Sequence, residues 1–253
     1  HIVAKIEDQE AVRNIDGIIA EANLIMVARG DLGIEVNIEE LPIIQRKIVK
    51  RCLELGTRVI VATHMLESML SNPLPTRAEV TDVSNAVFEE ADAVMLSGET
   101  SIGKYPTECV EILNRIARRI ERSGGLGFAK EAKLRTERQK TVRSAIMLAD
   151  SIADARIVVF TRRGNMPVQT ALLRPHSSIH AFAPDDATCR KVKLARGVIT
   201  RQISFEGGAD AVLMRAVEAL KSEKVVSEGT PLVVISDMVQ EGKVIDSVLL
   251  IHA

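Results

Sequence analysis

The chain alternates between short apolar runs and longer segments in which apolar residues recur at helical spacing. In the first half, the apolar runs cover residues 2–6, 24–28, 58–63 and 93–97, and the helical patterns cover 11–22, 39–56, 81–91 and 106–125. Strands with little polar alternation, each followed by a helix, are typical of a parallel sheet covered by helices. The pattern therefore predicts four successive strand–helix units.

A second series of elements follows a charged segment. Residues 124–140 carry many charges and only weak periodicity, so we expect a linker there, with a mobile surface helix as the alternative. Beyond it, helices are predicted at 141–153, 166–174, 185–195 and 209–224, and strands at 156–161, 178–184, 198–204, 231–237 and 244–253. This pattern predicts an open-sheet α/β domain over 141–253, after a first domain over 1–123.

Composition narrows the class of protein. Hydrophobic residues make up 46% of the 253 and charged residues 26%, which is typical of a soluble globular chain. A net charge of −1 and only 2% aromatic residues argue against nucleic-acid and membrane partners. Cys52, Cys109 and Cys189 are too widely spaced for a zinc site or a disulfide framework, so we expect a cytoplasmic protein.

Residues that can bind charge follow each of the four front strands. Functional groups of parallel α/β folds gather at the carboxyl ends of strands. The first strand carries Lys5 and then Glu7, and residues two apart on a strand point the same way. A lysine and a carboxylate would therefore face one pocket, although a local ion pair at the rim is the alternative.

The second strand ends on a glycine-bracketed acid, Gly30–Asp31–Leu32–Gly33. Glycine permits close approach of a ligand to the backbone, and a helix beginning here would point N–H groups at an anion. Asp31 adds a hard oxygen ligand and, together with Glu7, could hold Mg²⁺, which usually takes one or two protein carboxylates. A capped turn is the alternative.

Hydroxyl and acidic groups follow the third and fourth strands. Thr63 offers either a hydroxyl at the mouth of the pocket or a helix N-cap. A histidine in the position of His64 more often has a structural role. Ser97 and Glu99 are either pocket groups or a capping pair.

Several blocks of the sequence resemble the pyruvate kinase family. They are AKIE, MVARGDLG, VATHMLESML, PLPTRAEVTDVSNAV and DAVMLSGETSIGKYP, in the order and at about the spacings of that family. The resemblance is strong over residues 2–122 and looser over 141–253.

The resemblance implies a fold and an activity. Members of the family have a (β/α)₈ barrel with a small lid and an α/β C-terminal domain. The first domain would then be the second half of a (β/α)₈ TIM barrel. The family transfers the phosphoryl group of phosphoenolpyruvate to ADP in the last step of glycolysis, uses Mg²⁺ (or Mn²⁺) and usually K⁺, and is usually an allosteric tetramer.

The resemblance also assigns roles to residues. It places Lys5 beside the transferring phosphoryl group and the enolate oxygen, and it makes Glu7 and Asp31 the divalent-metal ligands. It implies that backbone N–H groups of Gly30 and Asp31 bind the substrate carboxylate, with the Thr63 hydroxyl alongside. Ser97 and Glu99 match the pocket residues that help to protonate the enolate.

The sequence departs from the family in three respects. Four strand–helix units make half a barrel, so we expect the other half, the lid and the K⁺ ligands to precede His1, and the chain alone to be inactive and prone to associate. His64 stands where many relatives carry Gln, and it could add to the pocket a group that gains and loses a proton near neutral pH.

The third departure lies in the loop where relatives bind an allosteric sugar phosphate. Thr161, Arg162, Arg163, Gly164 and Asn165 occupy this loop, with Arg163 in place of a usual Ser. The loop still provides N–H groups, a glycine and two cations that could hold a phosphorylated effector. A basic surface turn is the alternative.

Two further classes of function were weighed against the kinase. One is a non-catalytic regulatory or assembly module that binds a phosphorylated effector and joins subunits. The other is a lyase or aldolase with Lys5 as a Schiff base, which the neighbouring acidic pair disfavours because it suits a metal better than an uncharged amine.

Overall fold

The computed structural model describes residues 1–240 and 243–253, and the side chains of residues 1–236 and 246–253. Backbone contacts divide the chain into two compact units, His1–Lys133 and Leu134–Ala253. We describe each unit by itself. The division falls inside the segment 124–140 that was expected to be a linker.

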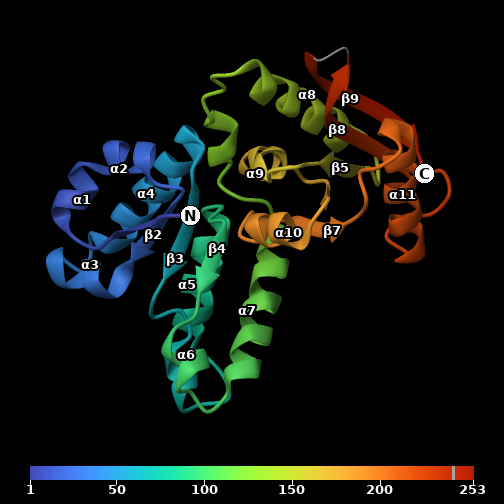
Figure 1. The fold of residues 1–253 in the computed structure, drawn as a ribbon. Coiled ribbons are helices and arrows are strands. Elements are labelled where there is room, and N and C mark those ends of the chain that lie inside the picture. Colours follow the sequence, from blue (N-terminus) through green and yellow to red (C-terminus); the bar gives the residue numbers. More distant parts are fainter. Residues whose placement is uncertain (241–242) are drawn as a thin grey trace. The chain divides into compact units, whose positions relative to one another are not determined.

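Unit 1 contains a parallel sheet of four strands in the order β1-β2-β3-β4 (Figure 1). The strands are β1 (Val3–Ile6), β2 (Leu24–Ala28), β3 (Arg58–Ala62) and β4 (Ala93–Met95). Their order in space is their order along the chain, as expected for successive strand–helix units that curve in one direction. The carboxyl ends of all four strands therefore lie at one edge of the sheet.

Helices connect these strands as the hydrophobic pattern predicts. They are α1 (Gln9–Arg13), α2 (Ile15–Glu21), α3 (Arg29–Glu35), α4 (Leu41–Leu55), α5 (Arg77–Phe88), α6 (Gly98–Ser101) and α7 (Pro106–Glu121), with a 3₁₀ turn η1 (Glu67–Leu70). Gly56 ends α4 in the left-handed conformation at φ 79°, as its predicted C-cap role requires. Pro106 occupies the first turn of α7, where its missing N–H is no loss.

The helices of unit 1 refine the sequence prediction. The helix expected at 11–22 is broken at Asn14 into α1 and α2. The helix expected from residue 81 begins at Arg77, because Thr76 and Glu79 form a reciprocal capping box. The glycine-bracketed stretch, for which a helix start was predicted with a capped turn as the alternative, is the seven-residue helix α3.

A single aliphatic core holds unit 1 together. Ile6, Val27 and Val61 from successive strands are fully buried and pack with Val49 and Leu53 of α4. At about 25 cal/mol per Å² of apolar surface removed from water, such contacts dominate the stability of the unit. The core fixes the strands, and therefore fixes the residues that follow each strand at the rim.

Part of the expected linker is folded. The 3₁₀ turn η2 (Phe128–Glu131) packs on α4, where Lys50 pairs with Glu131 at 2.9 Å. Its backbone is also held by the buried Glu90, whose carboxylate accepts from the N–H groups of Gly127 and Ala129. Helix α8 (Glu137–Ser151) then begins four residues before the predicted start at residue 141.

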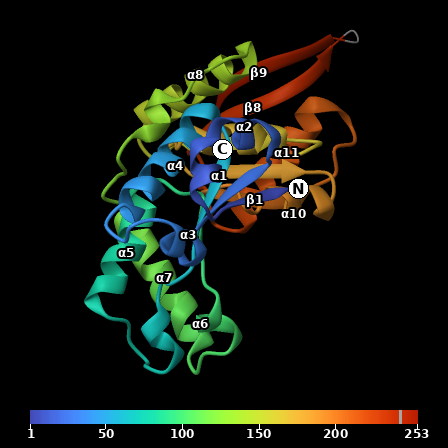
Figure 2. The same ribbon diagram turned by 90° about the vertical axis from the view of Figure 1, so that its left-hand side faces the viewer.

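Unit 2 is an open α/β sheet in the order β7-β6-β5-β8-β9. Its strands are β5 (Arg156–Phe160), β6 (Ile179–Ala183), β7 (Val198–Gln202), β8 (Pro231–Gln240) and β9 (Lys243–His252). The first four are parallel, and β9 pairs antiparallel with β8 as a long ribbon (Figure 2). The second-domain fold class predicted from sequence is confirmed.

The two faces of this sheet carry separate cores, because alternate residues of a strand point to opposite sides. Ile157 and Val159 lie in the core that includes α8 and α9 (Asn165–Leu172). Val158 and Phe160 face the core that includes α11 (Gly208–Ser222). Helix α10 (Asp186–Val192) connects β6 to β7. Across the described residues, no helix has both the length and the apolar character needed to cross a membrane.

Candidate active site

Lys5, Glu7 and Asp31 meet at the carboxyl ends of β1 and β2. Lys5 Nζ lies 2.6 Å from Glu7 Oε2 and 3.4 Å from Asp31 Oδ2. All three side chains are about half exposed, so a solute can reach them. The strand periodicity predicted that Lys5 and Glu7 share a face, and the parallel register brings the β2 acid to the same point.

The ammonium group of Lys5 is held in its charged form by this arrangement. A hydrogen bond from Lys5 to Glu7 and the charge of that carboxylate raise the pKa of Lys5 above its usual value, with a smaller contribution from Asp31. A lysine that stays protonated is a source of positive charge and not a nucleophile. This geometry disfavours the Schiff-base alternative.

The two carboxylates also suit a divalent metal. Each has an oxygen within 3.4 Å of one cationic atom, Lys5 Nζ, so both can approach a single cation. Their hard oxygen donors are those that Mg²⁺ prefers, and Mg²⁺ completes its shell with substrate oxygens and water. Within the described part of the chain, no group of three or more His, Cys, Asp or Glu side chains lies around one point.

Gly30 lies against the end of β3. Its backbone N–H donates to the Thr63 hydroxyl at 2.8 Å, and Thr63 Oγ1 donates in turn to the Ala62 carbonyl at 2.7 Å. A Cβ on residue 30 would lie 3.3 Å from His64 Cε1 and 3.5 Å from Thr63 Oγ1. The small size of Gly30 therefore accommodates two residues of this chain, in addition to any ligand.

Thr63 and His64 form a strained turn. The sequence offered Thr63 as a hydroxyl at the pocket mouth or as a helix N-cap; it directly follows β3, which ends at Ala62, and the next helical turn has Leu66 at its N-cap instead. Thr63 has φ 69° and His64 has φ 53°, so two consecutive residues with side chains adopt the left-handed region. That conformation is unfavourable for a β-branched residue and persists where neighbouring groups enforce it.

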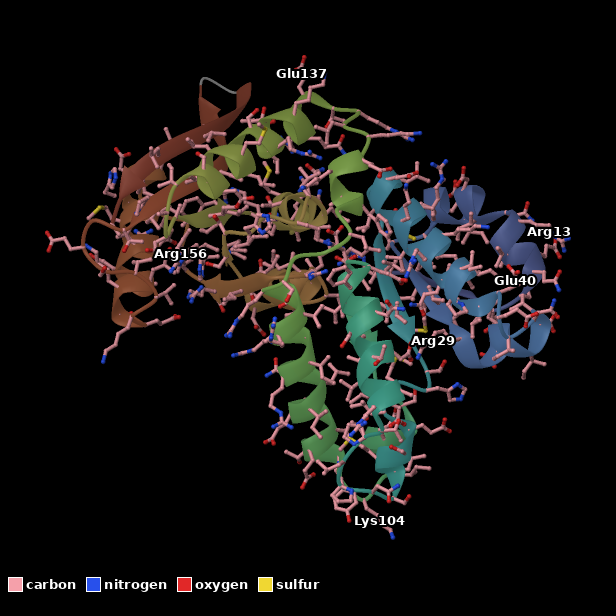
Figure 3. The ribbon with its side chains drawn as sticks, turned by 180° about the vertical axis from the view of Figure 1, so that it is seen from behind. Arg13, Arg29, Glu40, Lys104, Glu137 and Arg156 are labelled. Carbon is pink, nitrogen blue, oxygen red and sulfur yellow. The ribbon has the colours of Figure 1, made fainter. Side chains whose placement is uncertain are left out.

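Arg29 bonds to the backbone of this turn, and sequence reasoning missed it. Its side chain is only 7% exposed, and it donates to the carbonyl oxygens of Ala62, Thr63 and His64. Asp82 of α5 orients the guanidinium from the other side, with Oδ1 2.6 Å from Nη1. In Figure 3, Arg29 lies among the packed elements of unit 1, whereas the labelled Arg13 and Lys104 stand at its outer edges.

Ser97 and Glu99 lie at the end of β4 and differ in exposure. Ser97 is exposed, and its side chain makes no capping bond to α6. Glu99 is 3% exposed, with Oε1 accepting from the Leu66 N–H at 3.1 Å and Oε2 accepting from the Ser97 N–H at 2.8 Å. The acid joins two rim segments, and the hydroxyl next to it faces outward.

His64 projects from the rim. Its side chain is exposed, and Nε2 lies 3.9 Å from Glu67 Oε2. The ring also lies beside Gly30. It is therefore close to the predicted substrate site without being buried in it.

The candidate effector loop lies in unit 2, between β5 and α9. Thr161 is buried and its hydroxyl accepts from the Gly164 N–H at 2.9 Å, which fixes a tight turn. Gly164 has φ 87°, and a Cβ there would meet Val192 Cγ1 at 2.9 Å, so only glycine fits. Arg162, Arg163 and Asn165 are exposed, and the Arg162 guanidinium lies over the Phe205 ring at 5.2 Å.

Comparison with known proteins identifies both units. Residues 1–110 match the family described as "Pyruvate kinase, barrel domain", and residues 139–249 match "Pyruvate kinase, alpha/beta domain". The first match ends within α7, and the second begins within α8.

Individual relatives agree with these matches. A pyruvate kinase of Geobacillus stearothermophilus is 43% identical over 96% of this chain, and one of Bacillus licheniformis is 39% identical over 95%. Pyruvate kinase isozyme G, chloroplastic, of Ricinus communis is 39% identical over 90%. The chain spans 42%, 42% and 55% of the lengths of these three relatives.

Proposed function

Because this chain belongs to the pyruvate kinase family, we propose that the protein transfers the phosphoryl group of phosphoenolpyruvate to ADP, giving pyruvate and ATP. The observation that carries the proposal is the convergence of Lys5, Glu7 and Asp31 beside the Gly30–Thr63 hydrogen bond. Phosphoryl transfer depends on positioning and charge neutralisation more than on covalent catalysis, and this arrangement offers both.

Glu7 and Asp31 would hold the divalent metal, Mg²⁺ or Mn²⁺. When bound, the metal supplies positive charge that neutralises oxygens of the substrate. Lys5 acts on the same region from the protein side, because its protonated amine can stabilise negative charge on the transferring phosphoryl group and on the enolate oxygen. Lysine is protonated at neutral pH, so this charge is available to the substrate.

Thr63 is proposed to bind the substrate carboxylate. Its hydroxyl already accepts the Gly30 N–H, so its proton is free to turn from the Ala62 carbonyl toward an arriving anion. The backbone N–H of Gly30 then acts through Thr63, and the N–H of Asp31 is proposed to meet the carboxylate directly.

We propose separate roles for the two residues that follow β4. Ser97 is exposed at the rim and can take part in delivering a proton to the enolate carbon. Glu99 is buried and accepts two backbone N–H groups, which supports a role in positioning Ser97.

Other family properties remain predictions for this protein. They include dependence on K⁺, assembly into a tetramer, and inactivity of the 253-residue chain by itself. Relatives named as chloroplastic occur beside bacterial ones, so the cytoplasmic location also remains a prediction.

Unit 2 offers a second, compatible function in binding a phosphorylated effector. The fixed turn from Thr161 to Gly164 presents the exposed Arg162, Arg163 and Asn165 together. Two guanidinium groups beside backbone N–H groups are suited to phosphate. If the intact protein lacks kinase activity, this effector-binding role would remain as the regulatory-module alternative.

The decisive experiment is an assay of phosphoenolpyruvate-dependent ATP formation by the intact protein, with and without Mg²⁺. We expect ATP to form only when the metal, ADP and phosphoenolpyruvate are all present. Absence of ATP formation in the presence of Mg²⁺ and K⁺, by protein shown to be folded, would refute the proposed activity.

A further inference from the structure

We infer that Arg29 is a positioning residue of this site, which holds the Thr63 hydroxyl at the rim by enforcing the left-handed turn at residues 63 and 64. The inference rests on the proposed function for its kinetic consequences. Its structural content, that one guanidinium maintains a strained turn, stands independently of what the enzyme acts on.

The contacts of Arg29 are with three consecutive carbonyl groups. Arg29 Nε donates to the Ala62 and Thr63 oxygens, each at 3.2 Å, and Nη2 donates to the His64 oxygen at 3.3 Å. In an extended strand, successive carbonyls point in opposite directions. A single planar group reaches all three here because the left-handed turn brings these oxygens to one side.

Intrinsic backbone preference does not account for this turn. Positive φ is disfavoured for residues with a Cβ, and more strongly for β-branched threonine, so Thr63 and His64 do not adopt it by intrinsic preference. Neither residue is a glycine, the type that occupies this region most readily, and β-branched threonine is the less suited of the two. The conformation therefore depends on contacts from elsewhere in the chain, and Arg29 makes them from 33 to 35 residues away.

The guanidinium of Arg29 is itself fixed. Asp82 accepts from Nη1 at 2.6 Å, and Gln45 Oε1 lies 3.4 Å from the same nitrogen. Gln45 in turn donates to the buried Glu89 at 2.8 Å. A buried arginine needs such partners, and together they fix the orientation of its guanidinium group.

Arg29 acts through Thr63 and does not contact the substrate site directly. With Gln45, His64, Asp82 and Asn85, it lines a cavity of about 320 Å³. Lys5, Glu7 and Asp31, which mark the predicted substrate site, do not line this cavity. The guanidinium bonds to the Thr63 carbonyl oxygen, whereas the Thr63 hydroxyl bonds to the Gly30 N–H.

The test replaces the planar guanidinium group of Arg29 by the single ammonium group of lysine. Arg29→Lys keeps the charge but cannot reach three carbonyls together. In crystals of this variant we expect Thr63 or His64 to leave positive φ, and in the intact enzyme we expect kcat with phosphoenolpyruvate to fall at least tenfold, with a smaller change in the KM for ADP. Arg13→Lys, at an exposed position of the same unit, is the matched control and should leave both unchanged.

A rescue variant separates positioning from direct contact. Glycine favours positive φ, so adding His64→Gly to Arg29→Lys should restore the turn. The kcat of the double variant, divided by that of His64→Gly alone, should be at least threefold higher than the kcat of Arg29→Lys divided by that of the unmodified enzyme. If the double variant shows no recovery, or if the crystal structure of Arg29→Lys retains both left-handed residues, the inference is overturned.

A milder variant covers the case in which Arg29→Lys does not fold. Asp82→Asn preserves shape and removes the charge that orients the guanidinium, and it should produce the same backbone change and a smaller loss of kcat. An unchanged turn and unchanged kcat in Asp82→Asn would also contradict the inference. The dihedral angles can be read even if the protein has no kinase activity, so failure of the proposed function is distinguished from failure of this inference.

Discussion

The backbone N–H of Gly30 donates to the hydroxyl oxygen of Thr63 at 2.8 Å, which links the carboxyl end of β2 to that of β3. This bond cannot be predicted from the sequence of the motif at residues 29–33. The N–H group expected to meet a substrate carboxylate is already bonded, and we propose that the Thr63 hydroxyl is the group presented to the ligand.

Thr63→Val tests this bond. The variant keeps the branched shape but removes the hydroxyl proposed to bind the substrate carboxylate, and a hydrogen bond to a charged group is worth about 1.5–3 kcal/mol. We therefore expect kcat/KM for phosphoenolpyruvate to fall roughly ten- to a hundredfold. Thr63→Ser retains the hydroxyl and should keep most of the activity. Equal activity in the Val and Ser variants would show that the hydroxyl is not used.

Lys5→Met removes the cation between the two acids. Positive charge aimed at the transferring group is a large contribution to such reactions, so turnover should fall by about a thousandfold or more in the intact enzyme. Lys130→Met, at an exposed position in η2, is the control for loss of a lysine charge. Initial rates at saturating substrates give the comparison, and a rate for Lys5→Met within a factor of two of the unmodified enzyme would remove Lys5 from the mechanism.

Glu7→Gln and Asp31→Asn test the metal assignment. Each variant replaces an anionic oxygen donor by a neutral one, so the Mg²⁺ concentration that gives half-maximal activity should rise about tenfold or more in both. Glu39→Gln changes an exposed acid of the same unit and should leave that concentration unaltered. Calorimetric titration with Mn²⁺ provides a reading that does not depend on turnover. Unchanged Mn²⁺ affinity in both variants would argue that the metal binds elsewhere.

His180 in β6 predicts a pH dependence for unit 2. Burial, and then the nearby charge of Arg201, lower the pKa of His180 to about 4 from 6.5. Between these values the unfolded chain takes up a proton that the native state does not, so stability falls as pH drops from 6.5 toward 4, by roughly 2–3 kcal/mol. Urea unfolding at pH 7 and at pH 4.5 measures the loss.

A matched pair of variants isolates the contribution of His180 to this pH dependence. His180→Gln removes the titrating ring, so its stability should change less between the two pH values than that of the unmodified protein. His176→Gln, at an exposed position, should behave like the unmodified protein. If all three proteins lose the same stability on acidification, another group is responsible.

The three cysteines should be unreactive in the folded protein. Cys52, Cys109 and Cys189 are buried, and burial raises the pKa of each thiol, which suppresses the reactive thiolate. An aromatic disulfide reagent should therefore label none of them within minutes at pH 8 and all three in guanidinium chloride. Rapid labelling of one thiol under native conditions, located by mass spectrometry, would identify a region that opens locally.

The fold could be predicted from local pattern because strands and helices here bury continuous apolar faces. The run at 24–28 matches β2, and Gly56 and Pro106 mark helix ends by backbone chemistry that acts within one turn. The start of α5 could also have been predicted, because Thr76 followed three residues later by Glu79 is a capping-box pattern.

The missed features depend on contacts between distant residues. Arg29 reads as part of a charged turn, but its partner Asp82 lies 53 residues away and its carbonyl acceptors lie 33 to 35 residues away. The apolar run that ends at Thr63 predicts a strand through that residue, because nothing local announces a left-handed turn. The available signal was the position of Arg29 directly after a buried strand. A charged side chain there has either to reach solvent or to pair with a buried partner.

The buried carboxylate of Glu99 has a mechanical consequence. Because one side chain accepts from the N–H groups of both Leu66 and Ser97, the segments after β3 and β4 cannot separate without breaking bonds inside the protein. We therefore expect these two segments to move together. The segment after β2 is tied to the one after β3 as well, through the Gly30 N–H and the Arg29 guanidinium. Widening of the proposed mouth is therefore expected at β1, where, among the contacts of the described residues, Lys5 and Glu7 are joined to Asp31 only by ion pairs between exposed side chains.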